Sequence, residues 1–233
     1  MDTLTRPKLS DMVYETLANY ILDQGLQPGD KLPSEQELTT TLGIGRSTLR
    51  EGIRQLEAIG LLTSRQGYGV TINEITMDKV FQVGRPINLV DFLKLNKQEI
   101  LDLMDFRLLV EVEACRLAAD RISEEQLVSL ETYLNEMETR KNRSSSFITY
   151  DMKFHMEIAQ ASGSCVYPSV FKFIEGVFRK QQAVVASLPG AMGRALEYHK
   201  RLVGTLKARD GEQAALTMRK HLENTIAAIS RNL

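Results

Sequence analysis

Apolar residues at helical spacing predict helices along most of the chain. In the first segment they recur every four positions, at Leu9, Val13, Leu17 and Ile21. The helix over residues 9–24 ends where Gly25 is followed by the pair Pro28-Gly29. A second helix begins at Ser34, because Ser34 to Glu37 forms a capping box in which a hydroxyl and a carboxylate satisfy free backbone amides.

The next segment has the pattern of a winged helix-turn-helix. A tight turn over residues 42–45 leads into a third helix with Leu49, Ile53 and Leu56 on one face. Two short helices joined by a glycine-containing turn are the helix-turn-helix signature. Residues 61–65 and 69–72 then flank a turn at Gly67, which predicts a small β-hairpin that would form the wing.

The rest of the chain is predicted to be helical, with no strand signal. Its helices lie near residues 98–120, 123–141, 147–162, 166–187, 191–209 and 211–231. The predicted fold is mostly α, an N-terminal winged helix-turn-helix followed by an all-α antiparallel helical bundle. We expect a DNA-binding domain at 1–75, a linker at 76–96, and an all-helical domain at 97–233.

Composition places the protein among ordinary folded proteins. Its 233 residues are 43% hydrophobic and 25% charged, which argues against a disordered or collagen-like chain. Cys115 and Cys165 lie fifty positions apart without a partner motif, which argues against a disulfide framework and suits a reducing cytosol. No apolar run approaches a membrane span, and residues 1–10 have no apolar core of a signal peptide. We expect a cytoplasmic protein without a membrane partner.

Basic charge is concentrated on the third helix. The net charge of the chain is −1, whereas residues 42–70 hold four arginines against two glutamates. Arg46, Arg50 and Arg54 repeat every four positions, and Ser47 and Thr48 lie near the start of the helix. In helix-turn-helix proteins that end enters the major groove, where arginine binds guanine. The alternative is an ordinary solvated face of a core helix.

Three runs of sequence in this region resemble the winged-helix domain of the GntR family of bacterial transcription regulators. They read QPGDKLPSEQEL from residue 27, LGIGRSTLRE from residue 42 and LEAIGLL from residue 56. The resemblance implies that the chain binds double-stranded DNA through Arg46, Ser47, Thr48, Arg50 and Gly67. Two positions depart from the family pattern: Gln36 replaces an arginine that usually touches the DNA backbone, and Gly45 replaces the usual hydroxyl residue at the helix N-cap.

All three histidines fall in the C-terminal half of the chain. Asp151 and His155 are four residues apart, hence on one face of one helix, where both can reach a single metal ion. His199 and His221 are each about eleven residues from the turn at Asp210, so antiparallel packing of the last two helices brings their rings level. The alternative is that each histidine is a surface or satisfied core residue.

The C-terminal half resembles the FCD effector-binding domain of the FadR subfamily of GntR regulators. The resemblance is carried by FRLLVE from residue 106, by the Asp151 and His155 pair, by EYH from residue 197 and by MRKH from residue 218. It implies a metal site formed by Asp151, His155, His199 and His221, and it makes a fatty-acid sensor less favoured. It also makes Arg107 an inward-facing residue that would pair with the carboxylate of an effector. The alternative for Arg107 is a salt bridge to Glu111, one turn away.

These observations predict a homodimeric, sequence-specific transcription regulator, and a repressor rather than an activator. We expect it to bind a near-palindromic operator and to respond to a small carboxylate effector. Three imidazoles and a carboxylate suit a divalent metal ion, zinc first, with nickel, iron or manganese as alternatives. The rival functions are a metal-responsive regulator and a metal-dependent hydrolase-type enzyme. We expect no enzymatic activity, because no separate general base or nucleophile is evident.

Overall fold

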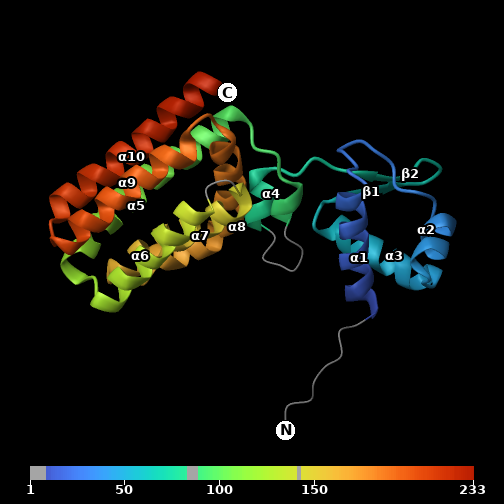
Figure 1. Cartoon of the computed structure of the whole chain (residues 1–233). Coiled ribbons are helices and arrows are strands. Elements are labelled where there is room, and N and C mark those ends of the chain that lie inside the picture. The colour runs from blue at the N-terminus through green and yellow to red at the C-terminus, as the bar shows by residue number, and fades with distance from the viewer. Residues whose placement is uncertain (1–8, 83–88, 141–142) are drawn as a thin grey trace, which may run out of the picture. The chain divides into compact units, whose positions relative to one another are not determined.

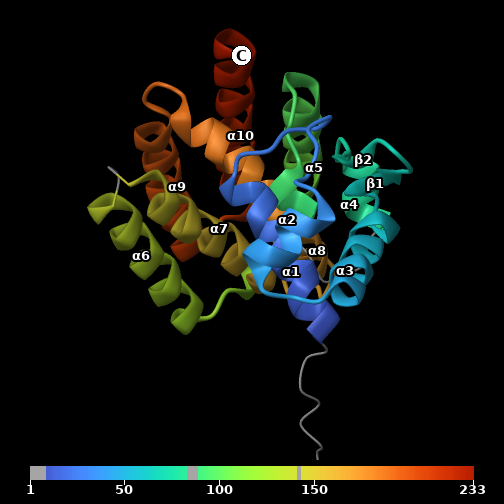
Figure 2. The same cartoon turned by 90° about the vertical axis from the view of Figure 1, so that its right-hand side faces the viewer.

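The computed structural model describes residues 9–82, 89–140 and 143–233, and divides into two compact units, Met1–Lys94 and Leu95–Leu233. The first unit contains α1 (Leu9–Asp23), α2 (Glu35–Leu42), α3 (Arg46–Ala58), β1 (Leu62–Arg65), β2 (Gly69–Ile72), α4 (Met77–Gln82) and a 3-10 helix, η1 (Leu89–Phe92) (Figure 1). The second contains α5 (Lys97–Arg121), α6 (Glu124–Thr139), α7 (Ser144–Ala161), α8 (Val166–Ser187), α9 (Ala191–Lys207) and α10 (Gly211–Asn232) (Figure 2). These elements confirm the predicted fold class.

In the first unit, α1 and α2 pack against α3 around a buried apolar core. A side chain at Gly52 would place its Cβ 2.7 Å from Val13 Cγ1, so glycine allows the close approach of α3 to α1. The capping box at the start of α2 is complete, since Ser34 and Glu37 each accept a backbone amide of the other. Gly43 ends α2 in the left-handed conformation that glycine adopts without strain.

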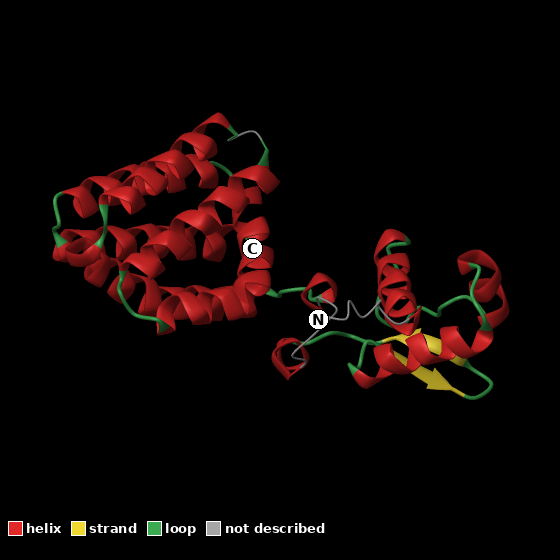
Figure 3. Ribbon diagram, turned by 90° about the horizontal axis from the view of Figure 1, so that it is seen from below, coloured by secondary structure: helices red, strands yellow, loops and turns green. Residues whose placement is uncertain are grey.

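The predicted wing is an antiparallel hairpin, and β1 and β2 are the strands of the described residues (Figure 3). Leu62 pairs with Ile72 and Arg65 with Gly69, which leaves Gly67 in the turn with a φ of 75°. The segment before α2 also joins β2, because Lys31 forms a bridge with Thr71. The sequence pattern did not indicate this third partner of the hairpin.

Three of the bundle helices differ from the predicted ranges by two residues or more at one end. Helix α7 begins at Ser144, before the predicted start at residue 147, because the apolar pattern begins only at Phe147, whose amide bonds to the Arg143 carbonyl. Helix α9 ends at Lys207 instead of 209, since Arg209 has a φ of 54° and its guanidinium bonds to the Ile122 carbonyl after α5. Helix α6 ends at Thr139, and the predicted end at residue 141 lies outside the described residues, as do residues 83–88 of the predicted linker.

The bundle places α5 to α10 around one core, and α5 and α10 form an extensive contact (Figures 1 and 2). Their approach is close at Gly211, where an added Cβ would lie 2.9 Å from the backbone oxygen of Arg116. Among the described residues, no helix has the combined length and apolar character needed to cross a bilayer. The inward faces of these helices carry the polar groups of the candidate site.

Candidate functional site

The first unit presents the predicted DNA-contacting residues at the start of α3. Arg46, Ser47 and Arg50 are exposed, and Thr48 is half-buried. Gly45 is the N-cap of α3, and it makes no side-chain capping bond because glycine has no side chain. The Arg50 guanidinium is ion-paired with Glu35 of α2, with Nη2 3.0 Å from Oε2. An exposed surface of hydroxyls, backbone amides and guanidinium groups can contact phosphates and base edges.

Gly67 is exposed in the hairpin turn, at the tip of the predicted wing. The neighbouring Tyr68 ring lies 3.5 Å from the Lys31 ammonium, a cation–π contact that connects the hairpin with the segment before α2. The positive charge of Lys31 therefore lies beside the wing tip, which suits contact with a phosphate backbone.

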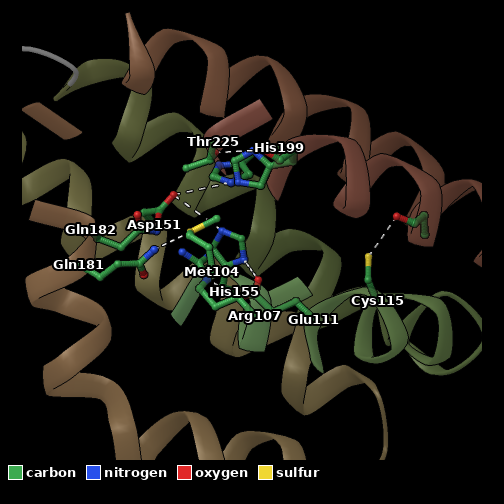
Figure 4. A network of polar contacts seen from close by, with 12 residues as sticks. Met104, Arg107, Glu111, Cys115, Asp151, His155, Gln181, Gln182, His199 and Thr225 are labelled. Atoms are coloured by element: carbon green, nitrogen blue, oxygen red, sulfur yellow. Dashed lines mark hydrogen bonds and ion pairs between the residues drawn. The ribbon is translucent and has the colours of Figure 1, made fainter. Parts of the chain in front are cut away.

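The second unit brings the three histidines together from three helices. Figure 4 labels two of them, His155 and His199. His155 of α7, His199 of α9 and His221 of α10 offer ring nitrogens that all lie within 4.8 Å of one another. The ring centroids of His199 and His221 are 4.9 Å apart, because their equal distances from the turn at Asp210 place them level on neighbouring antiparallel helices. All three side chains are buried.

Asp151 lies at the same cluster, one turn before His155 on α7. Its Oδ1 is 3.6 Å from Nε2 of His199 and 3.9 Å from Nε2 of His155. Its other oxygen, Oδ2, accepts a hydrogen bond of 2.5 Å from the Gln182 amide of α8. Burial raises the pKa of Asp151, and the nearby charges of His155 and Arg107 oppose that rise. One carboxylate oxygen is thus oriented toward the imidazoles by a neighbouring helix.

The three imidazoles, with Asp151 within 3.9 Å of two of them, are a donor set that suits a divalent metal ion. Nε2 of His155 and both ring nitrogens of His199 are buried without a hydrogen-bond partner in the described part of the chain. Such unpartnered buried polar atoms are costly unless another group satisfies them. Burial, together with the neighbouring positive charges, lowers the pKa of His199 well below its usual value and that of His221 to about 3. Both imidazoles are therefore neutral at pH 7, which is the form that binds a metal.

Glu111 of α5 connects His155 to Arg107 (Figure 4). Its Oε2 lies 2.5 Å from Nδ1 of His155, and Oε1 forms an ion pair with the Arg107 guanidinium. Burial alone would raise the pKa of Glu111, but Arg107 and His155 hold it at about 2, so the carboxylate is ionised. A carboxylate beside Nδ1 is the usual arrangement behind a metal-bound histidine, in which Nε2 is the nitrogen that binds the metal.

Arg107 forms the salt bridge considered as its alternative role, and its side chain also lies at a cavity. The salt bridge to Glu111 is present and buried. The pKa of Arg107 is raised by Glu111 against the effect of burial, so the guanidinium stays charged. The same side chain lines a cavity together with Asp151, His221 and Gln182. This cavity has about 30 Å³ of water-accessible volume, which is enough for a small polar group beside the histidines.

Comparison with known proteins identifies both units. Residues 9–72 match the family described as bacterial regulatory proteins, gntR family, and residues 102–224, more than half of the chain, match the FCD domain. This chain belongs to the GntR family and carries an FCD domain. It is a transcriptional regulator of a family that binds DNA through its helix-turn-helix, in agreement with the resemblance seen in the sequence.

Relatives of the GntR family match nearly the whole chain. The HTH-type transcriptional regulator LutR of Bacillus subtilis is 28% identical over 88% of this chain and 94% of its own length. The HTH-type transcriptional repressor NanR of Cronobacter sakazakii is 26% identical over 96% of this chain and 86% of its own length. The solved structure of E. coli McbR/YncC has the same fold, with a TM-score of 0.54 at 17% identity over 97% of this chain and 99% of that one.

Sequence reasoning missed two polar residues at the FCD cavity. Gln182 donates a hydrogen bond to Asp151, although the two are 31 positions apart in the sequence. Arg194 of α9 lines the same cavity as Arg107. For Gln182 a signal existed: Gln181 and Gln182 interrupt the apolar inward face of α8, and both are buried. For Arg194 no local signal existed, because an arginine in the first turn of an amphipathic helix is ordinarily solvated.

Proposed function

We propose that this GntR regulator is a repressor whose DNA binding is controlled by a small carboxylate bound at a divalent metal ion in the FCD domain. The observation that carries the proposal is the four-donor cluster of Asp151, His155, His199 and His221, buried beside a cavity that Arg107 also lines. A divalent cation held there, zinc first and otherwise nickel, iron or manganese, would attract an effector carboxylate. Arg107 would pair with the same carboxylate through its planar guanidinium.

The cavity favours an organic effector over the metal as the signal. A pure metal sensor needs only the donor atoms, whereas here an additional space extends from the donors between α7, α8, α9 and α10. Glu157 and Glu197, the carboxylates that adjoin the ligands in sequence, do not line this space, which speaks against a hydrolase with one of them as general base. The repressor assignment is supported by the relative NanR, whose name describes that protein as a repressor.

We propose further that the regulator acts as a homodimer on a near-palindromic operator. One winged helix reads only a few base pairs, so two copies are needed for useful specificity. The neighbouring helices α5 and α8 expose large apolar side chains, with Leu109 77% and Phe173 70% exposed. A contiguous apolar patch marks an interaction surface, and we propose that these side chains belong to one that a second copy of the same helices covers.

Replacing both Leu109 and Phe173 with Asp should therefore shift the protein from dimer to monomer. The charged side chains would have to be buried at the interface, which is unfavourable without partners. Analytical ultracentrifugation measures the shift, and Val128→Asp, at another exposed apolar position on α6, is the matched control. A double variant that sediments as a folded dimer would refute this dimer surface.

An operator-binding assay tests the coupling between the effector site and DNA. Replacing His199 with Ala should leave affinity for the protein's own promoter DNA near the wild-type value, because α3 lies in the other unit. The same replacement should make operator affinity insensitive to carboxylates that release the wild-type protein from DNA. A ligand changes DNA affinity only if it binds the DNA-bound and free conformations with different affinities, and the variant would lose that ligand site. Electrophoretic shift assays with and without carboxylate and chelator measure both effects.

Two results would contradict this scheme. If the His199→Ala protein stayed folded and dimeric but lost operator binding, the site would be needed for the DNA-competent state itself. If chelator alone released the wild-type protein and no carboxylate had any effect, the metal ion would be the signal instead of an organic acid.

A further inference from the structure

The cavity beside the metal-ligand cluster contains a second arginine, Arg194 of α9. Its Nη1 donates a hydrogen bond of 2.9 Å to the Pro189 carbonyl in the loop before α9. In the part of the chain that the structure describes, the Arg194 guanidinium has no carboxylate partner, unlike that of Arg107, which is ion-paired with Glu111. Arg194 is half-buried as a whole residue, and it lines the cavity.

Arg194 lies beyond the metal ligands in the direction away from the turn at Asp210. It precedes His199 by five residues, which corresponds to about 7.5 Å along the helix axis. On the antiparallel α10, Asn224 and Thr225 follow His221 by three and four residues, so they extend in the same direction and also line the cavity. The cavity therefore has the metal ligands and Arg107 on one side and a second polar group of residues farther along α9 and α10.

Apolar residues line the cavity as well. Phe147 and Ile148 come from α7, Val185 from α8 and Met192 from α9. Such side chains suit a short aliphatic chain and offer no hydrogen bonds to a strongly hydrated group. The lining thus combines two separated arginines with apolar walls.

The charges around the cavity favour a dianion. A divalent cation and two arginines bring four positive charges, against the two negative charges of Glu111 and Asp151. A monocarboxylate would leave one of the remaining two positive charges without a partner, whereas a second acid group could form a charge-assisted pair with it. A ligand with two acid groups would compensate both of the remaining positive charges.

We propose that the effector is a dicarboxylate with a short aliphatic chain between its acid groups. One carboxylate occupies the small cavity beside the metal-ligand cluster and Arg107, and the other pairs with the half-buried Arg194. This inference rests on the proposed function, namely that a small carboxylate binds beside the metal ligands, and it adds the second charge of the ligand and the residue that recognises it.

Calorimetric titration of the zinc-loaded full-length protein tests the inference. The probes are succinate, glutarate and adipate, each compared with the monocarboxylate of the same chain length, butyrate, valerate and hexanoate. We expect the best dicarboxylate to bind about tenfold or more tightly than its matched monocarboxylate, the difference that one charge-assisted pair supplies. Arg194→Gln should remove this preference and leave monocarboxylate affinity near wild type, whereas Arg194→Lys should keep part of it.

The control variant is Arg201→Gln, which removes an exposed arginine of the same helix that does not line the cavity. It should keep the wild-type preference. If Arg194 only anchored the Pro189 loop, Arg194→Gln would weaken both ligand series equally, and the dicarboxylate inference would be overturned. Equal affinity of wild type for both series would overturn it as well, while the proposed function would stand. If neither series bound zinc-loaded wild type, the proposed function itself would fail.

Discussion

Purified wild-type protein should carry about one divalent metal ion per chain, and the His155→Ala/His199→Ala double variant should lose it. The variant removes two of the four donors, and both donors have Nε2 atoms close to Asp151. We expect metal affinity to fall by more than about 100-fold, since loss of a single group behind a ligand already costs about 10–100-fold. Elemental analysis after dialysis against a weak chelator measures the metal content.

The matched control is the Glu157→Ala/Glu197→Ala double variant. It removes two carboxylates that adjoin ligands in sequence but lie outside the cavity lining, and it should keep the metal. Because His199 stacks on Phe154 with ring centroids 4.5 Å apart, thermal melting must show that the histidine variant stays folded. Equal metal content in wild type and a folded histidine variant would rule out the four-ligand site.

Replacing Arg46 or Arg50 with Ala should abolish or strongly weaken operator binding. If either arginine reads a guanine, its loss should cost about 1–3 kcal/mol and relax the preference at one base position. The two replacements should not unfold the protein, because both side chains are exposed on α3. Arg50 has to exchange its ion pair with Glu35 for the DNA contact, whereas Arg46 has no ion-pair partner in the described part of the chain.

Fluorescence anisotropy with operator DNA at several salt concentrations measures these losses and separates base contacts from phosphate contacts. Arg54→Ala is the matched control, since Arg54 is an exposed arginine of the same helix, one turn beyond Arg50, and pairs with Glu51. Its loss should have a smaller effect. Wild-type affinity of a folded Arg46→Ala protein would show that another surface reads the DNA.

The local sequence determined most of the secondary structure of this regulator. The capping box at Ser34 predicted the start of α2, and the glycines around Gly67 predicted the hairpin, because caps and turns depend on residues a few positions apart. Helix boundaries were predicted less well where the apolar period starts late, as before Phe147 in α7. At the start of α10, the Asp210 side chain accepts the Gln213 amide without the reciprocal bond of a capping box.

For the candidate metal site, the sequence by itself supplied the donors that regular helices bring together. Four-residue spacing puts Asp151 and His155 on one face, and equal distance from one turn places His199 level with His221. Only the tertiary structure decided the contacts of Glu111 with Arg107 and His155 together, of Gln182 with Asp151, and of Arg194 with the cavity. The physical reason is that contacts between helices depend on how each helix is rotated and shifted against its neighbours, and the packing of the whole core fixes that arrangement.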